Sequence, residues 1–261
     1  MNPPSPVRKV DRALLKALGA LKLLGRGVLD LLYPPHCILC LTQTAAGQHV
    51  CPQCMAKSPP LGGSCCERCA QPFEGTFAET MSGSFICSAC RERKFAVDAA
   101  AAARAFQGPA RELIHRFKYQ HQLYLRHLLG EWLLEAMAAP RLSCPLPDAL
   151  VPIPLHPARQ RERGFNQAEV LARVASKRSG IPILHALKRL RFTATQTRLD
   201  REARIENLRN AFGMLQSVEV RNRHLLLIDD VLTTGSTLHE CARVLKAAGA
   251  ASVRAAAVLR G

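Results

Sequence analysis

Apolar and polar positions alternate along residues 96–261 in blocks that predict strands and helices in turn. The expected strands are short apolar runs of the kind that form buried parallel strands: 97–106, 148–154, 223–229 and 252–259. The intervening segments carry apolar residues at helical spacing, which predicts helices from 108 onward, over 123–138, over 166–179 and over 238–249. This alternation predicts the α/β class, with a mostly parallel sheet covered by helices on both faces.

The pattern is different before residue 96. Residues 1–8 are proline-rich and predict a disordered tail, whereas 9–32 combine helical apolar periodicity with interspersed basic residues. Such a basic amphipathic helix can make peripheral contact with an anionic membrane, or it can pack on the chain's own body or on a partner. Residues 33–95 have few apolar positions and many cysteines. The predicted domains are therefore an N-terminal tail and helix (1–32), a small cysteine-rich module (33–95) and an α/β domain (96–261).

Eight of the 11 cysteines form four Cys-x-x-Cys pairs. The residues are Cys37, Cys40, Cys51, Cys54, Cys66, Cys69, Cys87 and Cys90. This spacing is typical of structural zinc bound by four thiolates, so we expect two zinc ions in a double zinc ribbon. Sequential pairing is the simplest arrangement and a crossed one stays open, as does Cys65 in place of Cys66. Redox chemistry of a thioredoxin-like pair is the rival interpretation.

Charge and composition narrow the class of partner and the compartment. The 261 residues include 36 Lys and Arg against 20 Asp and Glu, a net charge of +16, which favours polyanions: phosphorylated metabolites, nucleic acid or anionic lipid. Aromatic residues are only 5%, which argues against a base-stacking platform. The sequence shows neither a secretory signal nor an uncharged apolar run of membrane-spanning length, and its cysteines have metal-site spacing, so a cytoplasmic location is expected.

The most specific chemistry follows the strand at 223–229. Asp229 and Asp230 stand where a strand leaves its sheet, and their carboxylates suit vicinal sugar hydroxyls and a hard cation such as Mg²⁺. A loop and a helix start follow them and form a cradle for a phosphate: Thr233, Thr234, Gly235, Ser236 and Thr237. The loop lacks the lysine of a nucleoside-triphosphate P-loop, so a phosphorylated sugar fits better. An acidic turn followed by an ordinary helix N-cap is the structural alternative.

A second anion site is predicted after the strand at 148–154. Arg159, Arg161 and Arg163 alternate in a loop that ends at Gly164, before the next helix. Guanidinium groups bind phosphate oxygens in pairs, so these residues suit a diphosphate, although a solvated basic loop would look similar. Residues 191–208 are polar and suit a mobile lid, with an exposed hairpin or helix as the alternative. The lid residues singled out are Thr195, Gln196, Thr197, Arg204 and Asn207.

The string from Asp229 to Thr237 resembles the phosphoribosyl-diphosphate (PRPP) signature of type I phosphoribosyltransferases. Over residues 30–261 the chain resembles the ComF family of competence and GntX-like proteins. The motifs that carry this resemblance are the cysteine pairs, Phe117-Lys118-Tyr119, Arg163–Gln167, Thr195-Gln196-Thr197, Arg204 with Asn207, and Asp229–Thr237. The resemblance implies a PRPP–Mg²⁺ site in which the acidic pair meets the ribose hydroxyls. It also implies a role in DNA uptake, with single-stranded DNA and a competence helicase or DNA-processing proteins as partners.

These expectations combine into a phosphoribosyltransferase-like protein whose acceptor is not identified by the sequence. Purine phosphoribosyltransferases usually carry an Asp at the position of Thr233, and a threonine cannot serve as a carboxylate base, which argues against purine salvage. The alternative function is a non-catalytic, single-stranded-DNA-binding component of a DNA-handling complex.

Overall fold

The computed structural model describes residues 34–62, 64–73, 85–92, 95–191 and 210–261. The chain divides into two compact units, 1–57 and 58–261. In those described ranges, no helix has the length and apolar character needed to cross a membrane. The amphipathic helix predicted at 9–32 lies outside the described residues.

The described part of the first unit is a small cysteine-rich fold. A bridge between His36 and Gln43 closes its first knuckle, and the helix α2 (Pro52–Ala56) carries the second. Pro52 stands in the first turn of α2, where its missing N–H costs nothing, and the Cys51 sulfur accepts a hydrogen bond from the Cys54 N–H. These short loops enclose little apolar core, so their folding depends on the cysteines as metal ligands.

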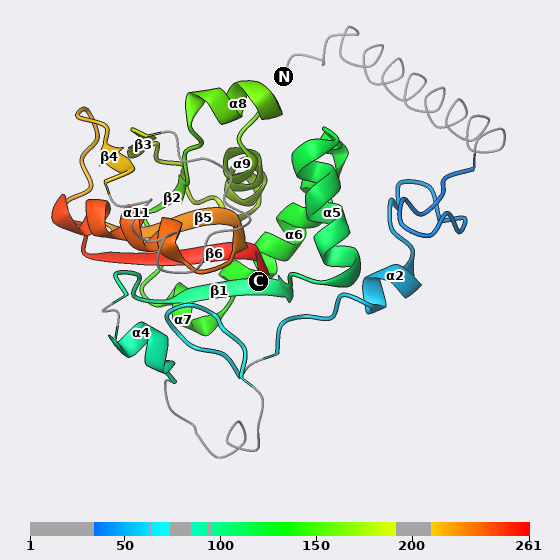
Figure 1. Cartoon of the computed structure of the whole chain (residues 1–261), viewed down its shortest axis with the longest axis horizontal. Coiled ribbons are helices and arrows are strands. Elements are labelled where there is room, and N and C mark those ends of the chain that lie inside the picture. The colour runs from blue at the N-terminus through cyan, green and yellow to red at the C-terminus, as the bar shows by residue number, and fades with distance from the viewer. Residues whose placement is uncertain (1–33, 63, 74–84, 93–94, 192–209) are drawn as a thin grey trace, which may run out of the picture. The chain divides into compact units, whose positions relative to one another are not determined.

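The second unit is built on a four-stranded parallel sheet in the order β1-β6-β5-β2 (Figure 1). The strands are β1 (Ala100–Ala105), β2 (Ala149–Pro152), β5 (His224–Leu232) and β6 (Ser252–Arg260). Every neighbouring pair in this sheet is parallel, which confirms the predicted α/β class. The strand β5 is central and runs three residues past Asp229, so the acidic pair lies within the strand rather than in the following turn.

The helices follow the strands as the periodicity predicts, with one exception. They are α4 (Ser88–Glu92), α5 (Gly108–Tyr119), η1 (Leu123–Leu125), α6 (Arg126–Met137), α7 (Pro140–Ser143), α8 (Pro157–Arg163), α9 (Gln167–Ser179) and α11 (Ser236–Ala247). The prediction of a loop at the three arginines was wrong, because they lie on α8. Pro157 begins α8, the His156 ring caps it, and Gly164 ends it in the left-handed conformation (φ 71°).

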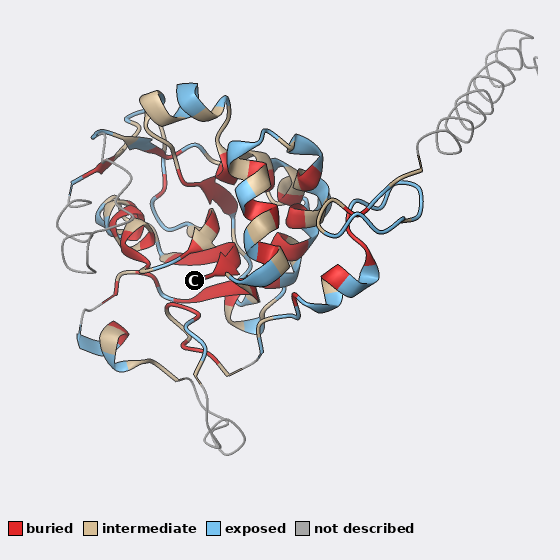
Figure 2. Ribbon diagram, turned by 45° about the vertical axis from the view of Figure 1, so that its right-hand side comes forward, coloured by how far each residue is buried: buried red, intermediate tan, exposed pale blue. Residues whose placement is uncertain are grey.

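The two faces of the sheet are covered by different elements. On one face, Leu225, Leu227 and Ala255 join a buried cluster with α11 and with the cysteines of the second quartet. On the other, α6 and α9 pack against each other and against the sheet, and Trp132 of α6 is 1% exposed. Figure 2 shows the buried strands lying between these layers. The second cysteine quartet is therefore part of the core that supports the sheet.

A small antiparallel pair, β3 (Leu187–Arg189) and β4 (Phe212–Met214), stands apart from the main sheet. It frames the segment that was predicted as a lid. Thr195, Gln196, Thr197, Arg204 and Asn207 lie outside the described residues, so the lid stays a prediction.

Candidate functional site

The acidic pair lies near the carboxyl end of β5, the edge at which open α/β sheets bind ligands. The Asp230 side chain is buried and accepts an ion-pair contact of 2.8 Å from Nζ of Lys118, which stands in the last turn of α5. The Asp230 N–H donates to Oδ1 of Asp229 at 2.8 Å. One carboxylate is therefore neutralised within the protein, and the other is held beside it by the backbone.

Asp229 is the carboxylate whose charge is only partly compensated. Burial and the neighbouring negative charge of Asp230 raise the pKa of Asp229 to about 7, and the Lys118 charge only partly opposes them. At neutral pH this group can therefore exchange a proton for a cation or accept a hydroxyl donor. Two carboxylates in this state are the oxygen ligands that Mg²⁺ prefers, so the residues present fit that ion.

The turn predicted to hold a phosphate, 233–237, lies at the junction of β5 and α11. Gly235 adopts the left-handed conformation (φ 73°) and caps α11, whose first N–H groups and dipole favour an anion. The Thr234 and Ser236 hydroxyls lie 2.9 Å apart, and the Ser236 N–H reaches the Thr234 hydroxyl at 3.4 Å. Thr233 is exposed and Ser236 is buried. The four hydroxyls thus differ in their access to solvent, although they share one short turn.

Two of the three predicted arginines point the same way. Arg159 and Arg163 lie one helical turn apart on α8 and are half-buried, whereas Arg161 is exposed. Arg163 donates to the Tyr119 hydroxyl and to Oε1 of Gln167, each at 3.2 Å. Burial and the nearby charge of Arg163 lower the pKa of Arg159. Tyr119 follows Lys118 directly, so the end of α5 links the arginines to the acidic pair.

Sequence reasoning missed two cations in this region. Lys118 was noticed only as part of a resemblance motif, yet it pairs with Asp230. Arg189 of β3 was not singled out, and it lies within electrostatic reach of Arg159 and Asp229; burial and the Arg159 charge lower the pKa of Arg189. For Lys118, the available signal in the sequence was its position near the end of a predicted helix. The sequence carried no signal for Arg189, whose place depends on the β3–β4 pair.

The eight paired cysteines gather into two quartets, in the sequential arrangement. Cys37, Cys40, Cys51 and Cys54 form one, and Cys66, Cys69, Cys87 and Cys90 form the other, with all sulfur atoms of a quartet within 4.8 Å of one another. The Cys40–Cys51 and Cys69–Cys87 sulfurs lie 3.5 and 3.8 Å apart. Zn–S bonds of about 2.3 Å in a tetrahedron place sulfurs about 3.8 Å apart, so both quartets fit a zinc ion.

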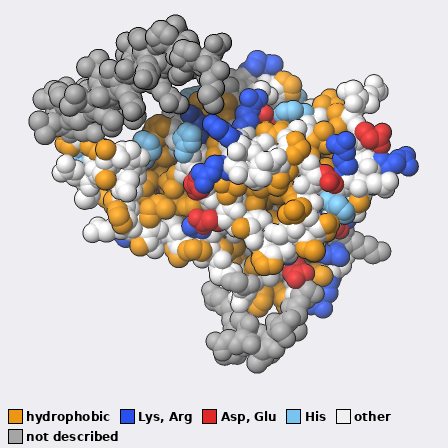
Figure 3. Space-filling view, turned by 180° about the vertical axis from the view of Figure 1, so that it is seen from behind, with side chains coloured by type: hydrophobic (Ala, Val, Ile, Leu, Met, Phe, Trp, Pro, Cys, Tyr) orange, Lys and Arg blue, Asp and Glu red, His pale blue; other side chains and the backbone are white. Residues whose placement is uncertain are grey.

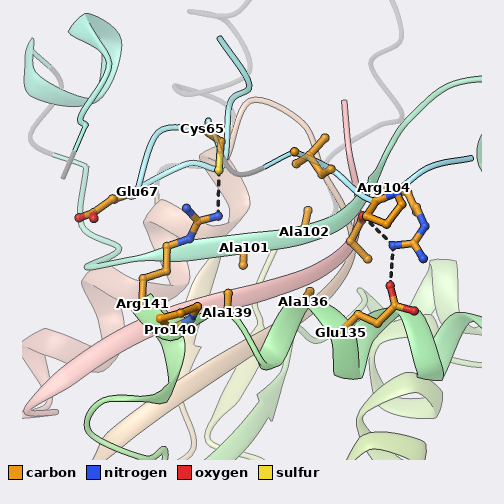
Figure 4. Close-up of a pocket in the computed structure, with 14 residues that line it drawn as sticks. Cys65, Glu67, Ala101, Ala102, Arg104, Glu135, Ala136, Ala139, Pro140 and Arg141 are labelled. Atoms are coloured by element: carbon orange, nitrogen blue, oxygen red, sulfur yellow. Dashed lines mark hydrogen bonds and ion pairs between the residues drawn. The ribbon is translucent and has the colours of Figure 1, made fainter. Parts of the chain in front are cut away.

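Cys65 does not belong to the second quartet. Its sulfur accepts a hydrogen bond of 3.0 Å from Arg141 and points into a separate cavity of about 400 Å³ (Figure 4). Ala101 and Ala102 of β1 form the floor of this cavity, and the Arg104–Glu135 ion pair of 2.6 Å lies at its other end. None of the residues predicted for sugar-phosphate binding lines it.

A second cavity, of about 380 Å³, begins at the phosphate loop. Thr233 and Thr234 line one side of it, and its other walls come from the second cysteine quartet, the carboxyl end of β6 and two phenylalanines. The remaining lining residues are Cys69, Gln71, Ala89, Cys90, Phe95, Phe106, Arg260 and Gly261. The room beside the cradle therefore lies between the sheet and the second quartet.

Comparison with known proteins agrees with both parts of the molecule. A model of the double zinc ribbon domain matches residues 28–91, and a model of the phosphoribosyl transferase domain matches residues 152–261. The chain is therefore a phosphoribosyltransferase-like α/β protein with an N-terminal double zinc ribbon. It belongs to the ComF family, as its relatives show.

Three relatives define this membership. Competence protein F of Haemophilus influenzae is 38% identical over 150 residues, which cover 56% of this chain and 66% of that protein. DNA utilization protein YhgH of Escherichia coli K12 is 31% identical over 230 residues, covering 85% and 95%. Competence protein ComFC of Bacillus subtilis is 28% identical over 225 residues, covering 82% and 85%. Among solved structures, glutamine PRPP amidotransferase from B. subtilis aligns with 50% of this chain and 25% of its own, at 19% identity and a TM-score of 0.33.

Proposed function

We propose that this protein binds PRPP with Mg²⁺ and transfers its phosphoribosyl group to an acceptor, in the cytoplasm and in connection with DNA uptake or use. One observation carries the proposal. A buried parallel strand delivers Asp229 and Asp230 directly to an anion cradle at the start of α11, and the arginines of α8 are linked to the same acidic pair through the end of α5.

Each group has a role in this proposal. The 5′-phosphate occupies the turn from Thr233 to Thr237, and the ribose hydroxyls meet Asp229 and Asp230. The diphosphate meets Arg159 and Arg163, with Arg161 and Gly164 at the edge of the same helix. Mg²⁺, when bound, would neutralise charge on the departing diphosphate oxygens.

The chemistry that this arrangement favours is displacement at the anomeric carbon. The acceptor forms a bond to that carbon while the bond to the diphosphate oxygen breaks, and the diphosphate leaves with the electron pair. Positive charge on the sugar develops beside Asp229 and Asp230, and negative charge on the leaving group develops toward the arginines, so both ends of the breaking bond are stabilised.

Calorimetric titration with PRPP–Mg²⁺ tests the proposal. The zinc-loaded protein should bind with a 1:1 stoichiometry, and the Asp229→Asn/Asp230→Asn double variant should lose at least tenfold in affinity. Glu112→Gln is a matched control, because Glu112 is an acidic residue of α5 that pairs with Arg116 of the same helix. Binding that is equal in all three proteins would contradict the assigned site.

A second candidate function is binding of single-stranded DNA without catalysis. The names of the relatives, competence protein and DNA utilization protein, favour it, as does the net charge of +16. On the face drawn in Figure 3, Lys and Arg side chains stand in several separate groups among apolar ones rather than in one continuous stripe. Charge dispersed in this way is not the continuous basic stripe typical of many nucleic-acid-binding proteins, so this candidate is carried by the net charge and by the names of the relatives.

The salt dependence of oligonucleotide binding tests this candidate. Affinity measured by fluorescence anisotropy should fall steeply between about 50 and 200 mM salt if several phosphates are contacted. The Asp229→Asn/Asp230→Asn variant separates the two functions: a DNA-binding protein keeps its oligonucleotide affinity in this variant, and a transferase loses turnover. Absence of salt-dependent binding at low ionic strength would exclude the second candidate.

A further inference from the structure

The second cysteine quartet is physically connected to the phosphate loop through Phe95. The Phe95 side chain is 4% exposed and stacks on His239 of α11, with ring centroids 5.7 Å apart. A Cβ atom added to Gly235 would lie 2.7 Å from Cζ of Phe95. The ring therefore fills the space directly against Gly235 and supports the left-handed turn at that residue.

The backbone of Phe95 is hydrogen-bonded to the second cysteine quartet on both sides. Its N–H donates to the carbonyl of Cys90 at 3.4 Å, and its carbonyl accepts from Arg68 at 3.4 Å. Arg68 lies between Cys66 and Cys69 in the first knuckle of the quartet. Ala96, the next residue, donates its N–H to Nδ1 of His239 at 3.1 Å. Both knuckles of the quartet thus fix the backbone that carries Phe95.

Arg260 makes a second connection on the other side of the loop. Its guanidinium is buried, and it donates to the carbonyl of Cys69 at 2.8 Å and to the carbonyl of Leu232 at 3.0 Å. Leu232 is the last residue of β5 and immediately precedes Thr233. One side chain therefore ties a cysteine of the quartet to the residue from which the loop begins, across the wall of the cavity of about 380 Å³.

We propose that metal binding at Cys66, Cys69, Cys87 and Cys90 is thermodynamically coupled to anion binding at the 233–237 loop, with Phe95 and Arg260 as positioning residues. A structural zinc site supplies much of the folding free energy of the short segment that carries it. Without the metal the knuckles lose their fixed geometry and release Phe95 and Arg260. Part of the ligand's binding free energy must then be spent on ordering the loop, so the ligand binds more weakly.

Coupling of this kind is reciprocal. If zinc in the second quartet increases the affinity for an anion, then the anion increases the affinity of that quartet for zinc by the same factor. The first quartet belongs to the other compact unit, 1–57, and serves as an internal control. The identity of the preferred anion rests on the proposed function, whereas the coupling itself requires only that some phosphate group occupies the loop.

The test measures zinc transfer to a chromophoric chelator at equilibrium. The Cys37→Ser/Cys40→Ser variant reports on zinc in the second quartet alone. The parent protein, with both quartets occupied, then shows whether zinc in the first quartet also responds to the ligand. PRPP–Mg²⁺ and, separately, inorganic phosphate are added at saturation, with chloride to match ionic strength. We expect either ligand to lower zinc transfer from the second quartet by about fivefold or more and to leave the first quartet unchanged.

A matched pair of variants tests the route. Phe95→Leu should retain zinc but lose most of the ligand effect on zinc transfer, together with a similar factor in phosphate affinity. Phe73→Leu alters the ring pair that Phe73 forms with Phe85 in the same ribbon and should keep the full effect. Equal loss in both variants would mean that general loosening of the ribbon, and not Phe95, carries the coupling, and would overturn the assignment of Phe95.

The outcomes separate this inference from the proposed function. Protection of zinc by phosphate but not by PRPP would contradict the proposed substrate and keep the coupling. PRPP binding seen by calorimetry, with zinc transfer unchanged, would overturn the coupling and keep the substrate. No change with either ligand, and no binding of either, would overturn both.

Discussion

At the scale of single residues, the site combines paired charges with one carboxylate, Asp229, whose charge is only partly compensated. Lys118 neutralises Asp230, and Arg163 is held by Tyr119 and Gln167, whereas the pKa of Asp229 is raised to about 7 by burial and by Asp230. The surroundings that raise the pKa of Asp229 disfavour its ionised form when the site is empty. A bound cation would favour that ionised form. We therefore expect pH, stability and the proposed ligand binding to be linked at Asp229.

The first prediction is a pH dependence that belongs to Asp229. A group with a pKa near 7 goes from about one-tenth to about nine-tenths ionised between pH 6 and 8, so affinity for PRPP–Mg²⁺ should rise roughly tenfold over that interval. Calorimetry in buffers of different ionisation enthalpy should show proton release on binding near pH 6. Because PRPP itself titrates, Asp229→Asn is the reference, and an identical pH profile in the variant would contradict the assignment.

The same shift predicts an effect on stability with a definite sign. The folded protein holds a proton on Asp229 that the unfolded chain releases at lower pH, so this group makes stability fall as pH rises from about 4 through about 7. Asp229→Asn should remove that decrease and leave the variant more stable than the parent at pH 8. Urea unfolding at pH 5 and pH 8, with zinc present, measures the difference.

The Lys118–Asp230 pair supplies a further prediction. Both side chains are largely buried, so Lys118→Met should leave a carboxylate without its partner and lower the free energy of unfolding by about 3 kcal/mol. Adding Asp230→Asn should recover most of that loss, since the unpaired charge is then absent. A double-mutant cycle by urea unfolding checks this, and additive losses would show that the pair is not coupled.

At the scale of elements, close approaches between helices and loops fix where the site residues lie. A Cβ atom on Gly130 of α6 would overlap the Cγ1 atom of Val174 on α9, so these two helices meet at a glycine. Gly235 combines a left-handed backbone with the Phe95 contact. If α6, α9 or the loop at Gly235 moved outward, the packing that covers the sheet would be lost.

Filling the α6–α9 contact should be destabilising. Gly130→Leu is expected to lower the free energy of unfolding by about 2 kcal/mol, because the two helices must separate or adopt strained rotamers. Val174→Ala in the same chain makes room and should restore part of the loss, whereas Val174→Ala alone should cost less. Thermal and urea unfolding of the three variants measure the interaction, and an unchanged midpoint for Gly130→Leu would contradict this packing.

At the scale of the whole molecule, the two cysteine quartets have different relations to the fold. Cys66, Cys69 and Cys90 belong to the buried cluster of the sheet-bearing unit, 58–261, whereas the first quartet lies in the unit 1–57. A double zinc ribbon is one unit by sequence pattern, and its second half shares a core with the phosphoribosyltransferase-like sheet. Loss of metal from the second quartet should therefore affect the stability of the sheet-bearing unit more than loss of metal from the first quartet.

Metal content and unfolding test this difference together. The protein should contain two zinc ions per chain by elemental analysis, and Cys37→Ser/Cys40→Ser should retain one with little change in the main unfolding transition. Cys66→Ser/Cys69→Ser should also retain one, yet it should lower the midpoint of that transition strongly, because the second quartet supports the sheet. Equal midpoints in the two variants would contradict the structural distinction.

The sequence by itself determined the features that depend on local pattern. The period of the apolar positions predicted the strands and helices of the α/β unit, because burial on one or both faces imposes that period. The Cys-x-x-Cys spacing predicted the two metal quartets, since two ligands with two residues between them can reach one ion. The string from Asp229 to Thr237 predicted a cradle, because a strand, a glycine turn and a helix start are consecutive in the chain.

Only the tertiary structure decided what depends on contacts between distant segments. It placed Lys118 on Asp230, brought Arg189 near Asp229, left Arg161 exposed on a helix where a loop was expected, and set Phe95 against Gly235. It also separated Cys65 from its neighbour Cys66 by pairing it with Arg141. These pairings join residues that are far apart in sequence, and no periodicity or spacing specifies which distant side chains meet.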